Sequence, residues 1–331
     1  MSELIQVSNL RKSFVQRNHK EITILRDIDF TIGEGETLCV LGESGCGKTT
    51  LGKILAGLQP YSEGSYLFRG KEVSMLKKGD WNQFRSDVQM IHQNPYASLN
   101  PTMMVFDIIA NPIRRKYGIR DIDELYARVT DLLRTVCLTP VEDFVDKYPD
   151  ALSGGQRQRV SIARILAMDP KLIVVDEATS MIDTSLRISL LQTLLDIQMM
   201  RKVSYFFITH DIALGRFFAR RNRVMVMYLG KIVEIGDTDS IVTHPAHPYT
   251  KALISAVKGT SGMLEKADEE RYLLKDADIP SFSNLPEGCL FHPRCPECME
   301  GVCNCRAPEL VKVGENHFVS CSLYREEGQK R

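Results

Sequence analysis

A glycine-rich segment that ends in lysine and threonine is the part of the chain whose residue types most clearly predict chemistry. It reads Gly42-Glu43-Ser44-Gly45-Cys46-Gly47-Lys48-Thr49 and matches the pattern G-x-x-x-x-G-K-[ST] at every position. Glycines allow successive backbone N–H groups to point inward around an anion, and the helix N-terminus that follows adds positive partial charge. The lysine would neutralise phosphate oxygens, and the threonine hydroxyl would bind Mg²⁺. The pattern therefore predicts a nucleotide phosphate site rather than a chance glycine turn.

An apolar run that ends in two carboxylates predicts a second part of the same site. Leu172–Val175 has the composition of a buried strand, and Asp176 and Glu177 follow it directly. Ligands of open parallel sheets bind beyond the carboxyl ends of the strands. There Asp176 would hold Mg²⁺, directly or through water, and Glu177 would accept a proton from an attacking water. Taken alone, the two acids would be an ordinary solvated strand end.

A second glycine pair opens a predicted helix. Ser153 and Gln156 have the spacing of a capping box, and Gly154 and Gly155 stand between them. Each glycine costs a helix about 1 kcal/mol relative to alanine. The pair is therefore explained best if the backbone must approach a ligand closely, which makes this helix N-terminus a second anion site. The sequence leaves open whether both sites bind one nucleotide or nucleotides in different subunits.

Alternating strand and helix patterns predict the elements that position these residues. The predicted strands lie at residues 37–41, 171–176, 203–209, 224–229 and 232–235. Predicted helices at 49–58 and 186–200 lie between them, an alternation that is typical of a parallel α/β sheet. Leu125, Val129 and Leu132 recur with the period of one helix face, so residues from about 95 to 168 are expected to form an inserted helical subdomain.

Composition limits the classes of function. Lysine and arginine together number 42, as do aspartate and glutamate, so no basic excess favours nucleic acid as a partner. No run of about 18 apolar residues predicts a membrane span, and the first residues do not resemble a signal peptide. We therefore expect a protein of the cytoplasm whose membrane role, if any, depends on partner proteins.

Cysteines are concentrated at the end of the chain. Six of the nine lie between Cys289 and Cys321. In a reducing compartment such a cluster binds metal more often than it forms disulfides. A polar stretch, residues 259–288, is expected to link this module (289–331) to the preceding domain (4–255).

Taken in order, these motifs resemble the ATP-binding subunit of an ABC transporter. The glycine loop is similar to that family's Walker A motif, Leu152–Gln156 to its signature, and Leu172–Glu177 to Walker B. Gln93 falls at the Q-loop, His210 at the switch histidine, and Phe14 where an aromatic ring would stack on adenine. Asp183 falls at the D-loop, where Met181-Ile182 replaces the usual Ala-Leu.

The resemblance implies a P-loop NTPase core of the ABC type and a head-to-tail dimer, in which the signature of one subunit closes over the phosphate loop of the other. Glu177, His210 and Lys48 would be catalytic, and Thr49, Gln93 and Asp176 would bind Mg²⁺. The implied ATP-binding residues are Phe14, Gly42, Glu43, Ser44, Gly45, Cys46, Gly47, Lys48, Thr49, Thr50, Gln93, Asp176, Ser153, Gly154, Gly155 and Gln156.

Two further segments resemble the oligopeptide/dipeptide permease ATPases: His247-Pro248-Tyr249-Thr250 and the nine residues from Gln93 to Pro101. The cysteine tail resembles the same group's C-terminal extension, which implies the ligands Cys289, Cys295, Cys303 and Cys321. Four thiolates suit a [4Fe–4S] cluster or, alternatively, Zn²⁺. Cys298 and Cys305 have no implied role.

The expected function is ATP hydrolysis coupled to peptide import at the cytoplasmic face of the inner membrane. The implied partners are a paralogous ATP-binding subunit in a heterodimer, two transmembrane permeases and an extracytoplasmic substrate-binding protein. Two alternatives remain: an importer of nickel, opines or metallophores, and a soluble ABC ATPase without a transport role.

Overall fold

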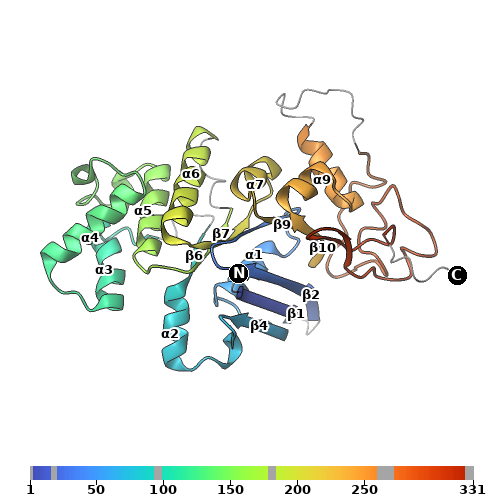
Figure 1. Ribbon diagram of the computed structural model, residues 1–331, viewed down its shortest axis with the longest axis horizontal. Helices are drawn as coiled ribbons and strands as arrows, with labels where there is room; N and C mark the ends of the chain where they lie inside the picture. The colour runs from blue at the N-terminus through green and yellow to red at the C-terminus, as the bar shows by residue number, and fades with distance from the viewer. Residues whose placement is uncertain (1–2, 16–20, 93–98, 178–183, 259–271, 325–331) are drawn as a thin grey trace.

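The computed structural model describes residues 3–15, 21–92, 99–177, 184–258 and 272–324, and their strands form two sheets (Figure 1). The larger sheet has the order β11-β12-β10-β9-β3-β8-β7-β6. Its strands are β3 (Thr37–Leu41), β6 (Val88–Ile91), β7 (Leu172–Asp176), β8 (Ser204–Ile208), β9 (Arg223–Tyr228), β10 (Lys231–Asp237), β11 (Val311–Gly314) and β12 (His317–Val319). The smaller sheet is antiparallel and consists of β2 (Glu21–Gly33), β1 (Glu3–Val15), β4 (Glu63–Phe68) and β5 (Lys71–Glu72), in that order.

The centre of the larger sheet is parallel, as the strand and helix alternation predicts. Strands β6, β7, β8, β3 and β9 all pair in parallel. Every residue of β3, β7 and β8 is buried. Continuous burial is expected where both faces of a parallel sheet are covered, and it explains why these strands read as uninterrupted apolar runs. The carboxyl ends of β3, β8 and β7 consequently meet at one edge of the sheet.

The rest of the larger sheet is antiparallel, so the parallel arrangement expected from the sequence holds only for the central strands. Only Leu229 and Gly230 join β9 to β10, and both residues have positive φ, as a two-residue hairpin turn requires. A parallel connection needs a dozen residues or more, so this turn forces β10 to run antiparallel. A side chain at position 230 would meet the Ile24 carbonyl oxygen at 1.9 Å, which explains the glycine.

Helices cover both faces of the larger sheet. Helix α1 (Lys48–Leu55) packs between the two sheets, and its Leu51, Ile54 and Leu55 share one apolar core with residues of both. The opposite face is covered by α5 (Gly154–Leu166), α6 (Thr184–Arg201), α7 (Ile212–Phe218) and α9 (Pro248–Lys258), with α8 (Thr238–Thr243) beside β10. Figure 1 shows α6, α7 and α9 on one side of this sheet and the smaller sheet on the other.

Between β6 and β7 the described residues contain helices and no strand. Helices α3 (Val105–Tyr117), α4 (Ile122–Thr135) and α5 pack on one another, whereas α2 (Lys78–Asp87) contacts β6. Single turns of 3₁₀-helix at Val73–Met75, Val141–Asp143 and Pro149–Ala151 complete the helical elements described. The signature glycines therefore sit where the insertion returns to the larger sheet.

The carboxy-terminal extension (from residue 289) is attached more closely to the preceding domain than a separate module on a linker would be. Strand β12 pairs with β10 and so adds the extension to the edge of the larger sheet. Strands this short, with β11 largely exposed, carry little periodic signal in the sequence. Residues 272–288 contain no helix or strand, yet they are joined to the extension, because the Lys275 N–H donates to the Arg294 carbonyl oxygen at 3.0 Å.

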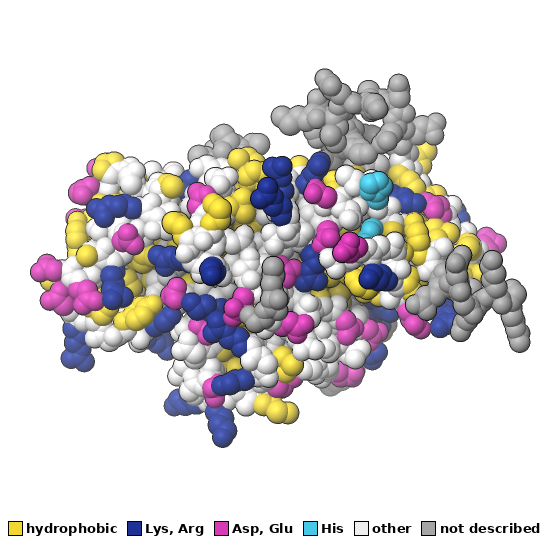
Figure 2. All heavy atoms as spheres, in the orientation of Figure 1, with side chains coloured by type: hydrophobic (Ala, Val, Ile, Leu, Met, Phe, Trp, Pro, Cys, Tyr) yellow, Lys and Arg dark blue, Asp and Glu magenta, His cyan; other side chains and the backbone are white. Residues whose placement is uncertain are grey.

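The surface fits the neutral composition, since side chains of both signs are interspersed over the face shown in Figure 2. Across the described ranges, none of the helices combines the length and the apolar character that a membrane crossing requires.

Candidate nucleotide-binding site

The phosphate loop leaves β3 and enters α1, as the motif requires. Gly42 has φ +152°, and a Cβ there would lie 2.3 Å from the Met227 carbonyl oxygen of β9. Gly47 has φ +107° and forms the N-cap of α1 without a side chain that caps the first turn. Because side chains are excluded at both glycines, the loop follows the neighbouring strand closely and leaves the first amides of α1 accessible to an anion.

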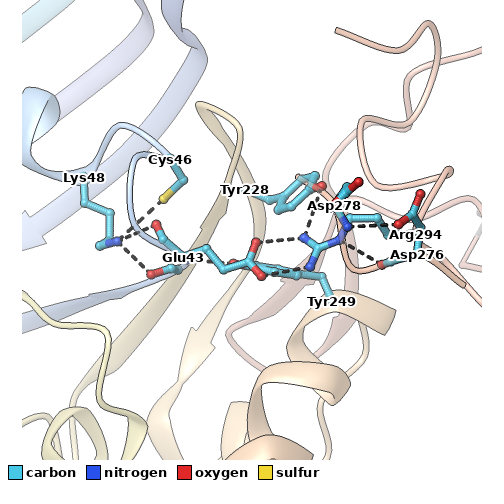
Figure 3. A network of polar contacts seen from close by, with 9 residues as sticks. Glu43, Cys46, Lys48, Tyr228, Tyr249, Asp276, Asp278 and Arg294 are labelled. Atoms are coloured by element: carbon cyan, nitrogen blue, oxygen red, sulfur yellow. Dashed lines mark hydrogen bonds and ion pairs between the residues drawn. The ribbon is translucent and has the colours of Figure 1, made fainter. Parts of the chain in front are cut away.

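Lys48 lies within the loop. Its side-chain ammonium donates to the carbonyl oxygens of Gly42 and Glu43 at 2.7 and 2.9 Å, and the residue is only 5% exposed. These bonds hold the positive charge against the curved backbone, as Figure 3 shows. A buried cation beside inward-facing amides is suited to binding phosphate oxygens.

Thr49 and Asp176 connect the loop to the acidic strand end. The Thr49 hydroxyl donates to Asp176 Oδ1 at 3.0 Å. Burial raises the pKa of Asp176 most, the Thr49 hydrogen bond opposes that effect, and the Glu177 carboxylate adds to it. A divalent cation would stabilise the ionised form of a carboxylate that is buried and has a like charge nearby. The chemistry of the pair, a hydroxyl and a carboxylate oxygen, therefore fits Mg²⁺.

Glu177 and His210 meet beyond the ends of β7 and β8. His210 Nδ1 lies 3.2 Å from Glu177 Oε1, and the Glu177 N–H donates to the Ile208 carbonyl oxygen at 3.1 Å. Glu177 has φ +46°, a left-handed conformation that is uncommon for a residue with a side chain. Such strain persists only where the surroundings impose it, and it gathers at functional sites.

A cavity of about 490 Å³ opens over the loop, within the range usual for ligand sites. Phe14 lies at its rim, 40% exposed, with Lys12 Nζ 4.9 Å from the ring centroid. The predicted site residues that line this cavity are Phe14, Ser44, Gly45, Gly47, Lys48, Thr49, Thr50 and Glu177. Ile22, Ile24 and Phe282 complete its described lining.

The remaining predicted residues lie elsewhere. Glu43 and Cys46 line an adjoining cavity of about 420 Å³, and burial raises the pKa of the Cys46 thiol, as fits a small filler of the loop. Gln93 and the D-loop residues Met181, Ile182 and Asp183 lie outside the described residues. Residues 152–156 are absent from the described lining of both cavities.

The signature segment has the local geometry that its sequence predicts. The Gln156 N–H donates to the Ser153 hydroxyl at 3.3 Å, and the Ser153 N–H donates to Gln156 Oε1 at 2.9 Å. This capping box begins α5 at Gly154. Within one subunit the segment therefore caps its own helix, and it does not contribute to the described wall of the phosphate-loop cavity.

Two contacts on the phosphate loop were not predicted from the sequence. The Glu43 N–H donates to the Tyr249 hydroxyl at 2.8 Å, and Arg294 forms a two-bonded ion pair with the Glu43 carboxylate (Figure 3). The Glu43 carboxylate, expected at the nucleotide, is thus bound by the extension. Tyr249 belongs to the His247–Thr250 segment, which resembles the oligopeptide/dipeptide permease ATPases. This resemblance is the sequence signal that marks Tyr249 as a residue of interest. Nothing local in the sequence indicates the partner of Arg294, which lies 251 positions away.

The four predicted cysteine ligands lie close to one another without forming a ligand set in the structure. The Cys289 N–H donates to the Cys303 carbonyl oxygen at 2.7 Å. Burial, with a smaller contribution from neighbouring thiols, raises the pKa of Cys289 to about 11 and that of Cys295 to about 12. Burial also raises the pKa of Cys321. Among the residues that the structure describes, no group of three or more histidine, cysteine, aspartate or glutamate side chains is placed to hold a metal ion.

Comparison with known proteins agrees with this geometry. Residues 25–180 match the ABC transporter family, and residues 233–303 match the oligopeptide/dipeptide transporter C-terminal region. The oligopeptide transport ATP-binding protein AppF of Bacillus subtilis is 38% identical over 95% of this chain and 94% of its own. The corresponding protein OppF of Escherichia coli is 37% identical over 96% and 95%.

Among solved structures, the dimeric ATP-binding cassette MJ0796 in a post-hydrolysis state with ADP and Pi has a TM-score of 0.63. It is 27% identical and covers 71% of this chain and 98% of its own. The fold, the loop geometry and the extent of these matches lead to one conclusion: the chain belongs to the ATP-binding proteins of ABC transporters and is an ATPase of the group that carries the oligopeptide/dipeptide transporter C-terminal region.

Proposed function

We propose that this chain hydrolyses ATP to drive the import of di- and oligopeptides through a membrane complex. The observation that carries the proposal is the meeting of the phosphate loop, the Thr49–Asp176 pair and the Glu177–His210 pair at the strand ends of a single sheet. The match of the C-terminal region to oligopeptide and dipeptide transporters supports peptides as the cargo. Nickel, opines or metallophores are the alternative cargo within the same group.

The roles of the site residues follow from where their polar atoms lie. Lys48 and the amides at the start of α1 bind the β- and γ-phosphates and neutralise the charge that develops during transfer. Thr49 and Asp176 would hold Mg²⁺, which would supply further neutralisation. Gln93 lies outside the described residues, and its part in this site rests on the family likeness alone. Glu177 accepts a proton from the attacking water, and His210 orients the Glu177 carboxylate through its imidazole contact. Phe14 stacks on the base.

The absence of the signature from the described wall of the cavity supports a head-to-tail dimer. Ser153, Gly154, Gly155 and Gln156 would approach the γ-phosphate bound by a second ATP-binding subunit. The partner is proposed to be a paralogue, and the pair would dock on two permeases at the cytoplasmic face of the inner membrane, with a substrate-binding protein on the other side.

Replacing the proposed base tests the hydrolytic step. Glu177→Gln removes the proton acceptor but keeps the shape of the side chain, so turnover should fall by about 10²- to 10⁴-fold while MgATP still binds. The matched control is Glu142→Gln, on an exposed 3₁₀ turn remote from the cavity. Phosphate release and equilibrium binding measure the two effects, and unchanged turnover in Glu177→Gln would remove this residue from the mechanism.

Isolation of the complex tests the transport role. An affinity-tagged chain, extracted in mild detergent from the cells that produce it, should bring down two integral membrane proteins and a second ATP-binding protein. Peptides, but not Ni²⁺, should then stimulate ATPase activity of the complex reconstituted with its binding protein. Recovery of the chain with neither permease would favour the soluble, non-transport alternative, and stimulation by Ni²⁺ alone would overturn the peptide cargo.

We also propose that Cys289, Cys295, Cys303 and Cys321 together bind a [4Fe–4S] cluster, with Zn²⁺ as the alternative. Four thiols within one small extension are a donor set that suits either metal. The Cys289 N–H donates to the Cys303 carbonyl oxygen, and, after burial, the thiols of Cys303 and Cys321 are close enough to contribute to the raised pKa of Cys289, so these cysteines share one region. Ligation would require the buried thiols to lose their protons, and metal binding would help to fold an extension with few core residues.

Metal analysis tests this donor set. Protein purified without oxygen should contain about four iron atoms and four acid-labile sulfides per chain, and Cys321→Ser should lose both. Cys137→Ser, at an exposed cysteine outside the extension, is the control and should retain them. Stoichiometric zinc would contradict the cluster and support the zinc alternative. A folded protein without metal would contradict both the cluster and the zinc site.

A further inference from the structure

The stretch that joins the carboxy-terminal extension to the preceding domain contributes to the wall of the nucleotide cavity. Residues 279–283 line the smaller cavity beside the phosphate loop, together with Glu43, Ser44 and Cys46. From this segment, Phe282 also lines the larger cavity that contains Lys48, Thr49 and Phe14. A stretch that the sequence marks as a linker therefore places one aromatic side chain at the proposed ATP site.

The lining residues show which parts of the cavity wall lie beside Phe282. Four residues line both cavities as Phe282 does: Ile22 and Ile24 of β2, and Ser44 and Gly45 of the phosphate loop. Ile22 is the register partner of Phe14 across the β1–β2 ladder, so these two side chains stand next to each other on one face of the small sheet. Phe282 therefore lies on the border between the two cavities, beside β2 and the phosphate loop, and shares the larger cavity with Phe14.

Both rings have apolar surface left for a ligand. Phe14 is 40% exposed, and Phe282 is half-buried, packed partly on the main core. The cavity between the phosphate loop and these rings keeps a volume of about 490 Å³, so Phe282 borders the space rather than filling it. A flat heteroaromatic base is the chemistry that such rings recognise.

An ion pair between Arg294 and Glu43 holds the segment beside the loop (Figure 3). Arg294 Nη1 and Nη2 donate to the two Glu43 carboxylate oxygens at 2.8 and 3.0 Å, and the Arg294 side chain is only 4% exposed. Arg294 also donates to the Tyr228 hydroxyl and to the Asp276 carbonyl oxygen, each at 3.4 Å. Asp276 precedes Phe282 by six residues, so the guanidinium connects the phosphate loop to the start of the segment.

We propose that Phe282 contacts the base of the bound nucleotide as a second aromatic residue beside Phe14, and that the Arg294–Glu43 ion pair positions it there. The inference rests on nucleotide binding at the phosphate loop and adds a base contact that comes from the stretch before the extension. Because stacking requires only a flat ring, this contact strengthens the binding of any purine nucleotide and leaves the binding of bare phosphates unchanged.

Binding of MgADP and of magnesium pyrophosphate to the full chain, measured by calorimetry, tests this contact. Phe282→Ala should weaken MgADP about tenfold, Phe282→Tyr should restore it to within about twofold, and neither should change pyrophosphate binding. The control is Ile279→Ala, in the same segment but outside the larger cavity, which should stay within about twofold of the unmodified chain.

The positioning role of Arg294 is tested by a double-mutant cycle. Arg294→Ala should weaken MgADP about as much as Phe282→Ala, and the double variant should be no more than about twofold weaker than either. Arg294→Lys, which cannot form the two-bonded pair, should lose most of the same affinity. Multiplied losses in the double variant would show that Arg294 does not act through Phe282. Circular dichroism and the melting temperature show whether the Arg294 variants fold. If they do not fold, the Phe282 variants still test the base contact.

Three results would overturn the base contact: MgADP binding by Phe282→Ala within twofold of the unmodified chain, tighter binding by that variant, or an equal loss for pyrophosphate. Tighter binding would mean that the segment obstructs the site, and an equal loss would place the effect on the phosphate loop. Failure of the unmodified chain to bind MgADP while it binds pyrophosphate would also contradict the contact. Failure to bind either ligand would instead contradict the proposed function itself.

Discussion

The close approach of the phosphate loop to its neighbours is the constraint on which the rest of the structure depends. Gly42 passes so near to β9 that no side chain fits, and Gly47 takes a left-handed turn into α1. With the backbone held in this way, the amides at the start of α1 and the Lys48 ammonium face one region of space. Thr49 then meets Asp176 only because β3 and β7 are parallel strands separated by β8, with carboxyl ends at the same edge.

Two segments that follow the parallel strands in the chain, α9 and the carboxy-terminal extension, also hold the phosphate loop. The Tyr249 hydroxyl accepts from the Glu43 N–H, and Arg294 pairs with the Glu43 carboxylate, so two of the polar groups of one loop residue are bound by these segments. Tyr228, Tyr249 and Phe291 pack together beside this contact, with ring centroids 4.7 to 5.4 Å apart. Removal of one partner of a buried charge pair is costly, so the extension and the ATP site are expected to respond to changes in each other.

Local pattern was enough to predict the chemistry and the central sheet. The loop motif, the acidic strand end and the capping box each depend on residues adjacent in the chain, and the structure has β3, β7 and the start of α5 at those places. Buried strands of five residues read as continuous apolar runs because both faces of the sheet are covered.

What could not be predicted depends on contacts between distant residues. No periodic signal marks β11 and β12, since they are short and take their order from pairing with β10. Phe282 lies in a stretch whose polar composition indicates a linker, and the partner of Arg294 is decided by how the extension folds back. By contrast, the antiparallel direction of β10 follows from the two-residue turn at Leu229-Gly230, a local signal that the sequence contains.

The central claim is that the loop around Lys48 binds the phosphates of ATP. Calorimetric titration of MgATP into the Glu177→Gln chain, which keeps the nucleotide intact, tests it most directly when compared with the same chain carrying Lys48→Ala. The account predicts saturable binding in the first protein and a loss of at least about tenfold in affinity in the second, because a buried cation that contacts the phosphates is removed. Equal affinities in the two proteins would contradict it.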